Sequence, residues 1–436
     1  MKKQLFKWDK LKATFWFIPV VLIVISILLS FILVYVDGLV RFPQDGFGRF
    51  LFVNSTDSAR SILSTISGAM MGVAGTVFSI TLVVLTLASS QFGPMLIKNF
   101  MYVRLNQVVL GSYISTYLYC LLVLNVIRDG NNYTFIPSLS ILVAIIAAIT
   151  NIILLIIFIH QISISIQANK VISDISDFIS KQVETLFPEK MGEAKEIEEN
   201  VDIATVISGY QKRISIKSPK SGYLQYIDSE ALMEIITKND SLLELHYRPG
   251  GHLVKDVEIG SLYSNDNWEK DELEKIFKQF VIGKNKTSQQ DLEYSINQMV
   301  EIALRALSPG INDPYTAIDC IDNLTATISY LAQAKFPSKY LFEDGGKLRI
   351  IADTIDFEGV LDAAFNQIRQ FSGRSTAVII RLLEALTTIY EFTKNENHKK
   401  AVIMHAEMVL TIGKESIKEK NDINDLTKRA EAILKK

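Results

Sequence analysis

The sequence has few of the residues on which covalent and metal-based sites depend. Only two cysteines occur in 436 residues, which excludes a disulfide scaffold, and we expect Cys120 and Cys320 never to meet. The five histidines are scattered, and none pairs at the spacing of a metal site built from cysteine and histidine. We therefore predict no cofactor.

Acidic residues are nearly missing from the first part of the chain. Residues 1–160 hold five aspartates and no glutamate against 11 lysines and arginines, whereas the remainder holds 42 acidic and 34 basic residues. A membrane half followed by an acidic soluble half explains this division. The acidic balance of the second half argues against a nucleic-acid partner, which requires a basic surface.

Charge is absent from four apolar runs, each long enough to cross a hydrocarbon core of about 30 Å. Their lack of carboxylates and arginines argues against a proton relay or a voltage sensor. The amides of Asn125 and Asn151 are expected to form hydrogen bonds between helices. The first run is too long for a signal peptide and lacks a small-residue cleavage motif, so we interpret it as an uncleaved span. The predicted spans cover about residues 14–36, 64–90, 107–127 and 138–159.

The lysines of the N-terminus and the basic residues after the second and fourth spans determine the predicted orientation. By the positive-inside rule they place the N- and C-termini in the cytoplasm. Three arginines in the first loop oppose this orientation, but aspartates lie between them. We expect a multi-pass protein of the cell inner membrane.

The second span carries small residues at three- and four-residue steps, which places them on one helical face. In lipid such a face allows another backbone to approach closely. It is expected to be enclosed by protein, either through tight packing in a bundle or as part of a pore or hinge. The residues of this small-residue strip are Ser64, Gly68, Gly72, Gly75 and Ser79.

Beyond the membrane domain, residues 1–160, we predict three further segments. Residues 161–202 form a helical connector and a charged linker, 203–264 a small β-barrel-like module, and 265–436 a helical domain. The phrases SGYLQYID and RPGGHLV resemble the barrel-sandwich arrangement of biotinyl-lipoyl domains. A carrier lysine motif is not visible, so we interpret the module as structural or as an interaction module.

Apolar spacing predicts several helices in the last segment. One stripe runs over 289–307, and the next helix begins with Asp313 as N-cap and Pro314 in its first turn. Further helices are expected at about 353–371, 374–396 and 398–418, and the lysine-rich tail is expected to fray.

The stretch RALSPGINDPYTAIDCID contains the candidate binding residues of the soluble part. Oxygen ligands from two carboxylates, an amide and turn carbonyls suit Mg²⁺ or Ca²⁺. The same aspartates also have an explanation without a metal: Asp313 caps the helix, and Asp319 and Asp322 are exposed to solvent. Acid–base catalysis by the pair Asp319 and Asp322 is disfavoured, because nothing nearby supplies a nucleophile. The candidate residues are Arg305, Asn312, Asp313, Asp319 and Asp322.

Two long motifs carry a family resemblance. TVFSITLVVLTLASSQFGPMLI with VVLGSYISTYLY, followed by ALSPGINDPYTAIDCID, resembles the bacterial predicted membrane proteins known as domain of unknown function 2254. The resemblance covers nearly the whole chain. It implies a bacterial multi-pass inner-membrane protein and transfers no catalytic residue.

Three functions follow as hypotheses. The first is an oligomeric channel or transport-related protein with a cytoplasmic gate or vestibule. The second is a membrane-anchored scaffold or sensor that binds a protein or a small ligand in the cytoplasm. The third, ranked last, is a metal-dependent hydrolase at Asp313, Asp319 and Asp322.

Overall fold

The described residues form two compact units, divided between Gln167 and Ala168. The basic N-terminus, most of the connector after the second span and the charged segment 189–200 lie outside the described residues. The computed structural model describes residues 14–40, 53, 55–93, 104–130, 133–165, 167–187 and 202–435.

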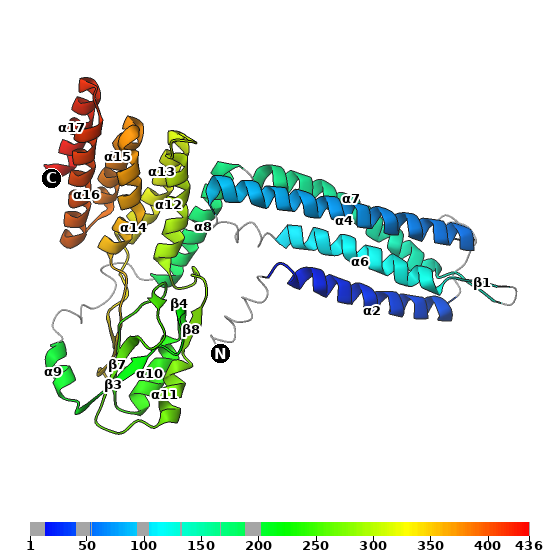
Figure 1. Ribbon diagram of the computed structural model, residues 1–436, viewed down its shortest axis with the longest axis horizontal. Coiled ribbons are helices and arrows are strands. Elements are labelled where there is room, and N and C mark those ends of the chain that lie inside the picture. The colour runs from blue at the N-terminus through cyan, green and yellow to red at the C-terminus, as the bar shows by residue number, and fades with distance from the viewer. Residues whose placement is uncertain are drawn as a thin grey trace. The chain divides into compact units, whose positions relative to one another are not determined.

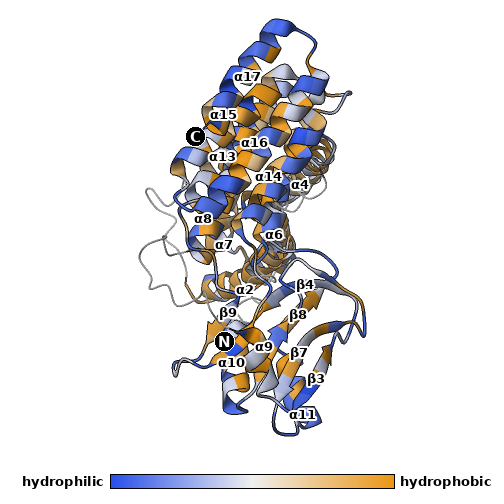
Figure 2. Cartoon of the chain, turned by 90° about the vertical axis from the view of Figure 1, so that its left-hand side faces the viewer, coloured by the Kyte–Doolittle hydropathy of each residue, from blue (hydrophilic) through white to orange (hydrophobic). Residues whose placement is uncertain are grey.

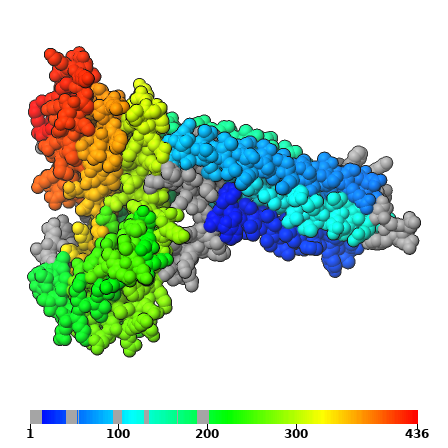
Figure 3. All heavy atoms as spheres, viewed as in Figure 1, coloured from blue at the N-terminus to red at the C-terminus, as the bar shows by residue number. Residues whose placement is uncertain are grey.

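Among the described residues, the first unit contains four helices that are long and apolar enough to cross a membrane, which confirms the predicted spans. The hairpin of β1 (Arg128–Gly130) and β2 (Tyr133–Phe135) joins the last two. The four helices lie side by side in Figure 1, and Figure 3 shows the atoms of α2, α4 and α6 packed along their length. They are α2 (Phe17–Leu39), α4 (Thr56–Phe92), α6 (Arg104–Val126) and α7 (Ser138–Ser165).

Helix α4 begins eight residues before the predicted start of its span at Ser64. Its first turns contain Asp57 and Arg60, yet Ala59 and Leu63 are fully buried against the other helices. Packing therefore extends the helix into a stretch whose composition resembles a loop. At 1.5 Å per residue its 37 residues measure about 56 Å, more than the hydrocarbon core requires.

Asn151 joins the membrane helices at the middle of α7. Its Oδ1 accepts a hydrogen bond from Ser112 at 2.6 Å, and its Nδ2 donates to Thr116 Oγ1 at 2.9 Å. The side chain is fully buried, so these bonds satisfy an amide that would be costly in lipid. This confirms the interhelical role predicted for Asn151, whereas Asn125 is exposed.

Asp37, near the end of α2, caps the start of α7. Its Oδ1 accepts from the backbone N–H of Leu139 at 2.9 Å, and its Oδ2 accepts from the N–H of Ser140 at 2.9 Å. The Ser140 hydroxyl donates to the same Oδ2 at 2.6 Å. A carboxylate from another helix thus fills the N-cap position, where it also opposes the positive end of the α7 dipole.

The second unit combines two sheets with a helical bundle. Its sheets contain β3 (Lys212–Lys217), β4 (Gly222–Ile227), β5 (Leu242–Leu245), β6 (His252–Leu253), β7 (Glu258–Ser264), β8 (Phe280–Gly283), β9 (Tyr340–Phe342) and β10 (Leu348–Ile351). Its helices are α8 (Ala168–Leu186), α9 (Ile203–Ser208), α10 (Ser229–Lys238), α11 (Lys270–Phe277), α12 (Leu292–Ala306), α13 (Pro314–Leu331), α14 (Phe357–Phe371), α15 (Thr376–Phe392), α16 (Glu396–Ser416) and α17 (Lys420–Leu434), with a 3₁₀ turn over Ser372–Arg374.

The sheets extend beyond the range 203–264 that alternation predicts. One has the order β3-β7-β5-β10-β9 and the other β6-β4-β8, so β8, β9 and β10 join them from later in the chain. Strand β10 pairs in parallel with β5, with Ile350 opposite Leu243. Because β9 and β10 are inserted between α13 and α14, the sheet and the bundle share one continuous stretch of chain.

The bundle follows the predicted helices closely, and its helices carry hydrophilic and hydrophobic residues on different faces (Figure 2). The expectation of a fraying tail is wrong, because α17 packs there. Leu426, Ala430 and Ile433 are fully buried at helical spacing, and a Cβ on Gly413 of α16 would lie 2.3 Å from Leu426 Cδ2. Most residues of α17 are polar, so the narrow apolar stripe is hard to recognise in the sequence.

Candidate functional site

The first of the predicted aspartates, Asp313, serves the start of α13 itself. Asp313 is the N-cap, as expected: its Oδ1 accepts from the N–H of Thr316 at 3.2 Å, and its Oδ2 accepts from the Thr316 hydroxyl at 2.6 Å. Pro314 opens the helix. Asn312 is exposed and has a left-handed backbone with φ of 52°, which an asparagine tolerates.

Asp319 and Asp322 lie on the same face of α13 but have different environments. Partial burial, and then the charges of Asp322 and Asp313, raise the pKa of Asp319. Asp322 instead forms an ion pair with Arg381 of α15 at 2.5 Å. Within the described part of the chain, no three carboxylate, histidine or cysteine side chains are arranged to hold a metal ion, so the geometry gives the metal-hydrolase hypothesis no support.

Arg305 lies at the end of α12, one helical turn after its ion-pair partner Glu301, with 3.5 Å between Nη2 and Oε1. The charges of Asp313 and Asp322 thus act on Asp319, whereas Arg305 pairs with Glu301 on its own helix. Asp322 lines a groove in the described part of the chain.

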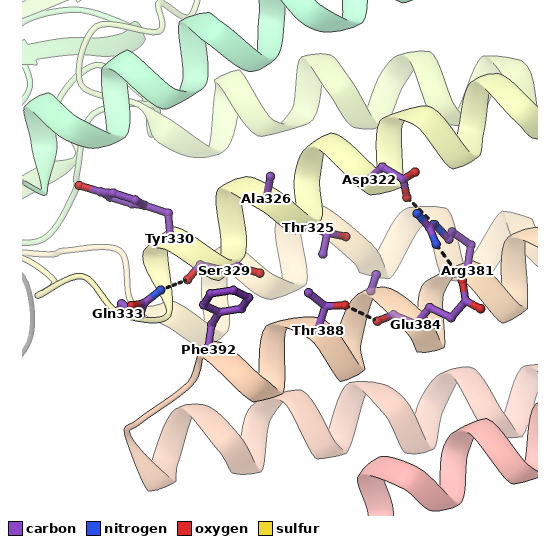
Figure 4. Close-up of a pocket in the computed structure, with 11 residues that line it drawn as sticks. Asp322, Thr325, Ala326, Ser329, Tyr330, Gln333, Arg381, Glu384, Thr388 and Phe392 are labelled. Atoms are coloured by element: carbon purple, nitrogen blue, oxygen red, sulfur yellow. Dashed lines mark hydrogen bonds and ion pairs between the residues drawn. The ribbon is translucent and has the colours of Figure 1, made fainter.

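This groove has a volume of about 480 Å³ and lies between α13 and α15. Each helix contributes residues at intervals of three and four, and small side chains, Ala326 and Ala385, line its middle. The helices run in the same direction along it, because Asp322 and Arg381 meet at one end and Tyr330 and Phe392 lie at the other (Figure 4).

One end of the groove is charged. The Arg381 guanidinium donates to Asp322 and, at 2.9 Å, to Glu384, and these two hydrogen bonds raise the pKa of Arg381. Arg429 of α17 donates in turn to Glu384 and to Asp425. The chain of ion pairs fixes the guanidinium of Arg381 beside the groove.

The other end is aromatic and uncharged. Tyr330 and Phe392 lie there with the Gln333 amide (Figure 4), and Phe392 is 47% exposed. Ser329 is buried, and its Oγ has no hydrogen-bond partner among the residues that the structure describes. A groove with an apolar middle and polar groups at both ends can bind a small molecule that has hydrogen-bonding groups at its two ends.

Arg381, Glu384, Tyr330 and Phe392 were not among the predicted site residues. The available signal is that α13 and α15 each place an alanine, Ala326 or Ala385, at the centre of a face whose neighbours are mostly polar. Ordinary core faces carry larger apolar side chains at these positions. The sequence does not show that these faces of α13 and α15 lie opposite each other, because that depends on the tertiary structure.

The small-residue strip on α4 faces away from the other described helices. Ser64, Gly68, Gly72, Gly75 and Ser79 are all exposed, and a Cβ placed on any of the three glycines would meet no described atom within 4 Å. The buried face of α4 carries Met70, Ala74 and Val77 among others. The described helices of this chain do not enclose the strip, and its role in helix packing or in a pore stays a prediction.

Comparison with known proteins gives three findings. The sequence model of a family described as predicted membrane protein matches residues 12–388. An uncharacterised protein of Mycobacterium bovis and one of Mycobacterium tuberculosis are each 28% identical over 381 residues, which covers 86% of this chain and 72% of theirs. No solved structure matches the chain.

Proposed function

The chain belongs to the predicted membrane protein family known as domain of unknown function 2254, and from this premise we propose that it is a membrane-anchored ligand sensor. Four spans anchor the protein in a bacterial inner membrane. The soluble unit binds a small molecule in the groove between α13 and α15.

The groove is the observation that carries this proposal. Its middle is formed by alanines rather than by larger core residues, and the buried Ser329 Oγ lacks a partner among the described residues. The ion pairs of Arg381 fix one end, so the binding surface is organised before a ligand arrives. Tyr330 and Phe392 offer ring faces at the other end, which suits an aromatic molecule.

We expect 4-hydroxybenzamide, a neutral aromatic with a polar group at each end, to bind the full-length protein in nanodiscs. Saturation-transfer NMR measures the binding. Ala326→Trp should weaken it about tenfold or more, because the indole fills the groove. Ala432→Trp, on the exposed face of α17, is the matched control and should leave binding unchanged. Equal binding to both variants, or none to the native protein, would remove the proposal.

The proposed orientation has both termini in the cytoplasm. Lysines of the N-terminus, Lys98 and Arg104 after the second span, and Lys170 and Lys181 after the fourth span support it by the positive-inside rule. Alkaline phosphatase fused at the C-terminus should therefore be inactive in cells, and green fluorescent protein at the same place should fluoresce. The reverse pattern would place the soluble unit outside.

An oligomeric channel is the second candidate function, favoured by the exposed strip on α4. Small residues such as Gly68 and Gly72 allow a helix of another copy to approach closely in lipid. An uncharged lining of this kind suits a weakly selective pore better than a coupled transporter. Currents from purified protein in a bilayer under tension or voltage would favour this function, and silence in a folded sample would remove it.

A further inference from the structure

A second cavity of about 230 Å³ lies where the sheets meet the helical bundle of the soluble unit. The ends of several elements converge there, including the turn after β5, the start of α10 and the start of α12. Aliphatic side chains form much of its wall, among them Leu232, Leu245 and Ile350. None of its residues lines the groove between α13 and α15, so this is a separate site.

Asp291 stands in this wall as the N-cap of α12. Its Oδ1 accepts a hydrogen bond from the N–H of Tyr294 at 2.9 Å. The residue is only 4% exposed, and its Oδ2 has no hydrogen-bond partner in the part of the chain that the structure describes. Burial raises the pKa of Asp291. A capping role explains one oxygen of this carboxylate. The other, Oδ2, lies beside Gly250 and lacks a donor among the described residues, although a buried acceptor without a donor is costly.

Most charged residues in the cavity lining are acidic. Arg248 lines the cavity and is bound to Glu293 at 2.8 Å and to Asp353 at 3.4 Å. Those two carboxylates and Asp291 together outnumber the one guanidinium, which leaves the lining with a net charge of −2 when all four groups are ionised. The field inside therefore favours a cation over an anion.

We propose that this cavity binds a small organic amine in its ammonium form, with the apolar body against the aliphatic wall and an N–H donating to Asp291 Oδ2. An ammonium group supplies what the site lacks, a charged donor for a buried carboxylate. The aliphatic wall selects an amine with a hydrocarbon body over a bare inorganic cation. This site goes beyond the proposed function and does not depend on it.

The test compares 2-phenylethylamine with 2-phenylethanol, which has the same body and no charge. Saturation-transfer titration on the full-length protein in nanodiscs should show the amine binding about tenfold or more tightly than the alcohol. In Asp291→Asn this preference should fall to within about twofold, while the α12 cap persists because asparagine is a good N-cap.

Two further variants separate this site from the groove. Ala352→Trp fills the second cavity and should remove binding of both compounds. Ala326→Trp fills the groove and should leave amine binding unchanged. Equal affinity for amine and alcohol, an amine preference that survives in Asp291→Asn, or no amine binding at all would each overturn the proposal.

Discussion

Replacing Gly250 with alanine should lower the unfolding temperature of the soluble unit by about 6–12 °C, corresponding to about 3 kcal/mol. Two effects combine. Gly250 has φ of +98°, a conformation that strains any residue with a Cβ. That Cβ would also lie 2.2 Å from Asp291 Oδ2, so the carboxylate must move and the α12 cap must weaken.

Gly346→Ala is the matched control for Gly250→Ala. Gly346 also has a positive φ, +79°, but its Cβ would meet no described atom within 4 Å, so only the backbone strain of about 1 kcal/mol remains. The double variant Gly250→Ala with Asp291→Ala removes the clash. Its loss in unfolding free energy should therefore be smaller than the sum of the losses of the two single variants.

Thiol exposure measures these changes, because the chain has two cysteines and both are buried and free. In a Cys120→Ala background, a maleimide dye reacts with Cys320 only when the soluble unit unfolds. If Gly250→Ala unfolds at the same temperature as Gly346→Ala, the close contact with Asp291 does not exist.

The second large effect is expected in the membrane unit. Asp37→Ala removes the acceptor for three hydrogen bonds at the start of α7 and should destabilise this unit by about 2–4 kcal/mol. The loss is large because the N–H groups of Leu139 and Ser140 sit at a helix start, where no backbone carbonyl of α7 can accept from them. Asp37→Asn, which retains one acceptor oxygen, should lie between the alanine variant and the native protein.

Cys120 reports on this unit in a Cys320→Ala background, since it is fully buried among the membrane helices. The control is Asp57→Ala in the first turn of α4, an exposed carboxylate whose interaction with the helix dipole is worth about 0.5 kcal/mol. If the Asp37→Ala and Asp57→Ala variants expose Cys120 at the same temperature, the capping role of Asp37 is contradicted.

Local signals made much of this fold predictable. The four spans follow from apolar length alone, and the α13 start follows from Asp313 and Pro314, because a cap and a first-turn proline act within a few residues. The paired amide of Asn151 follows from the cost of an unsatisfied polar group in lipid.

What the sequence could not predict depends on contacts between distant residues. Asp322 is recognisable as a surface carboxylate, but its partner Arg381 comes 59 residues later on another helix. Strand β10 is only four residues long, so its pattern is too short to separate it from a loop, and its place beside β5 comes from tertiary pairing. The α17 helix depends on three buried apolar residues, and one of them, Leu426, packs closely against Gly413 of α16, a contact that the local pattern does not reveal.

The parallel pairing of β5 with β10 has a consequence for how the soluble unit assembles. Leu243 and Ile350 become neighbours only after about 100 intervening residues, including α12 and α13, have been synthesised. The five-stranded sheet therefore cannot close on the ribosome before α12 and α13 have been synthesised, and closing so long a loop is slow. Protease cleavage between β8 and α12 should yield fragments that stay associated rather than an independent sheet domain.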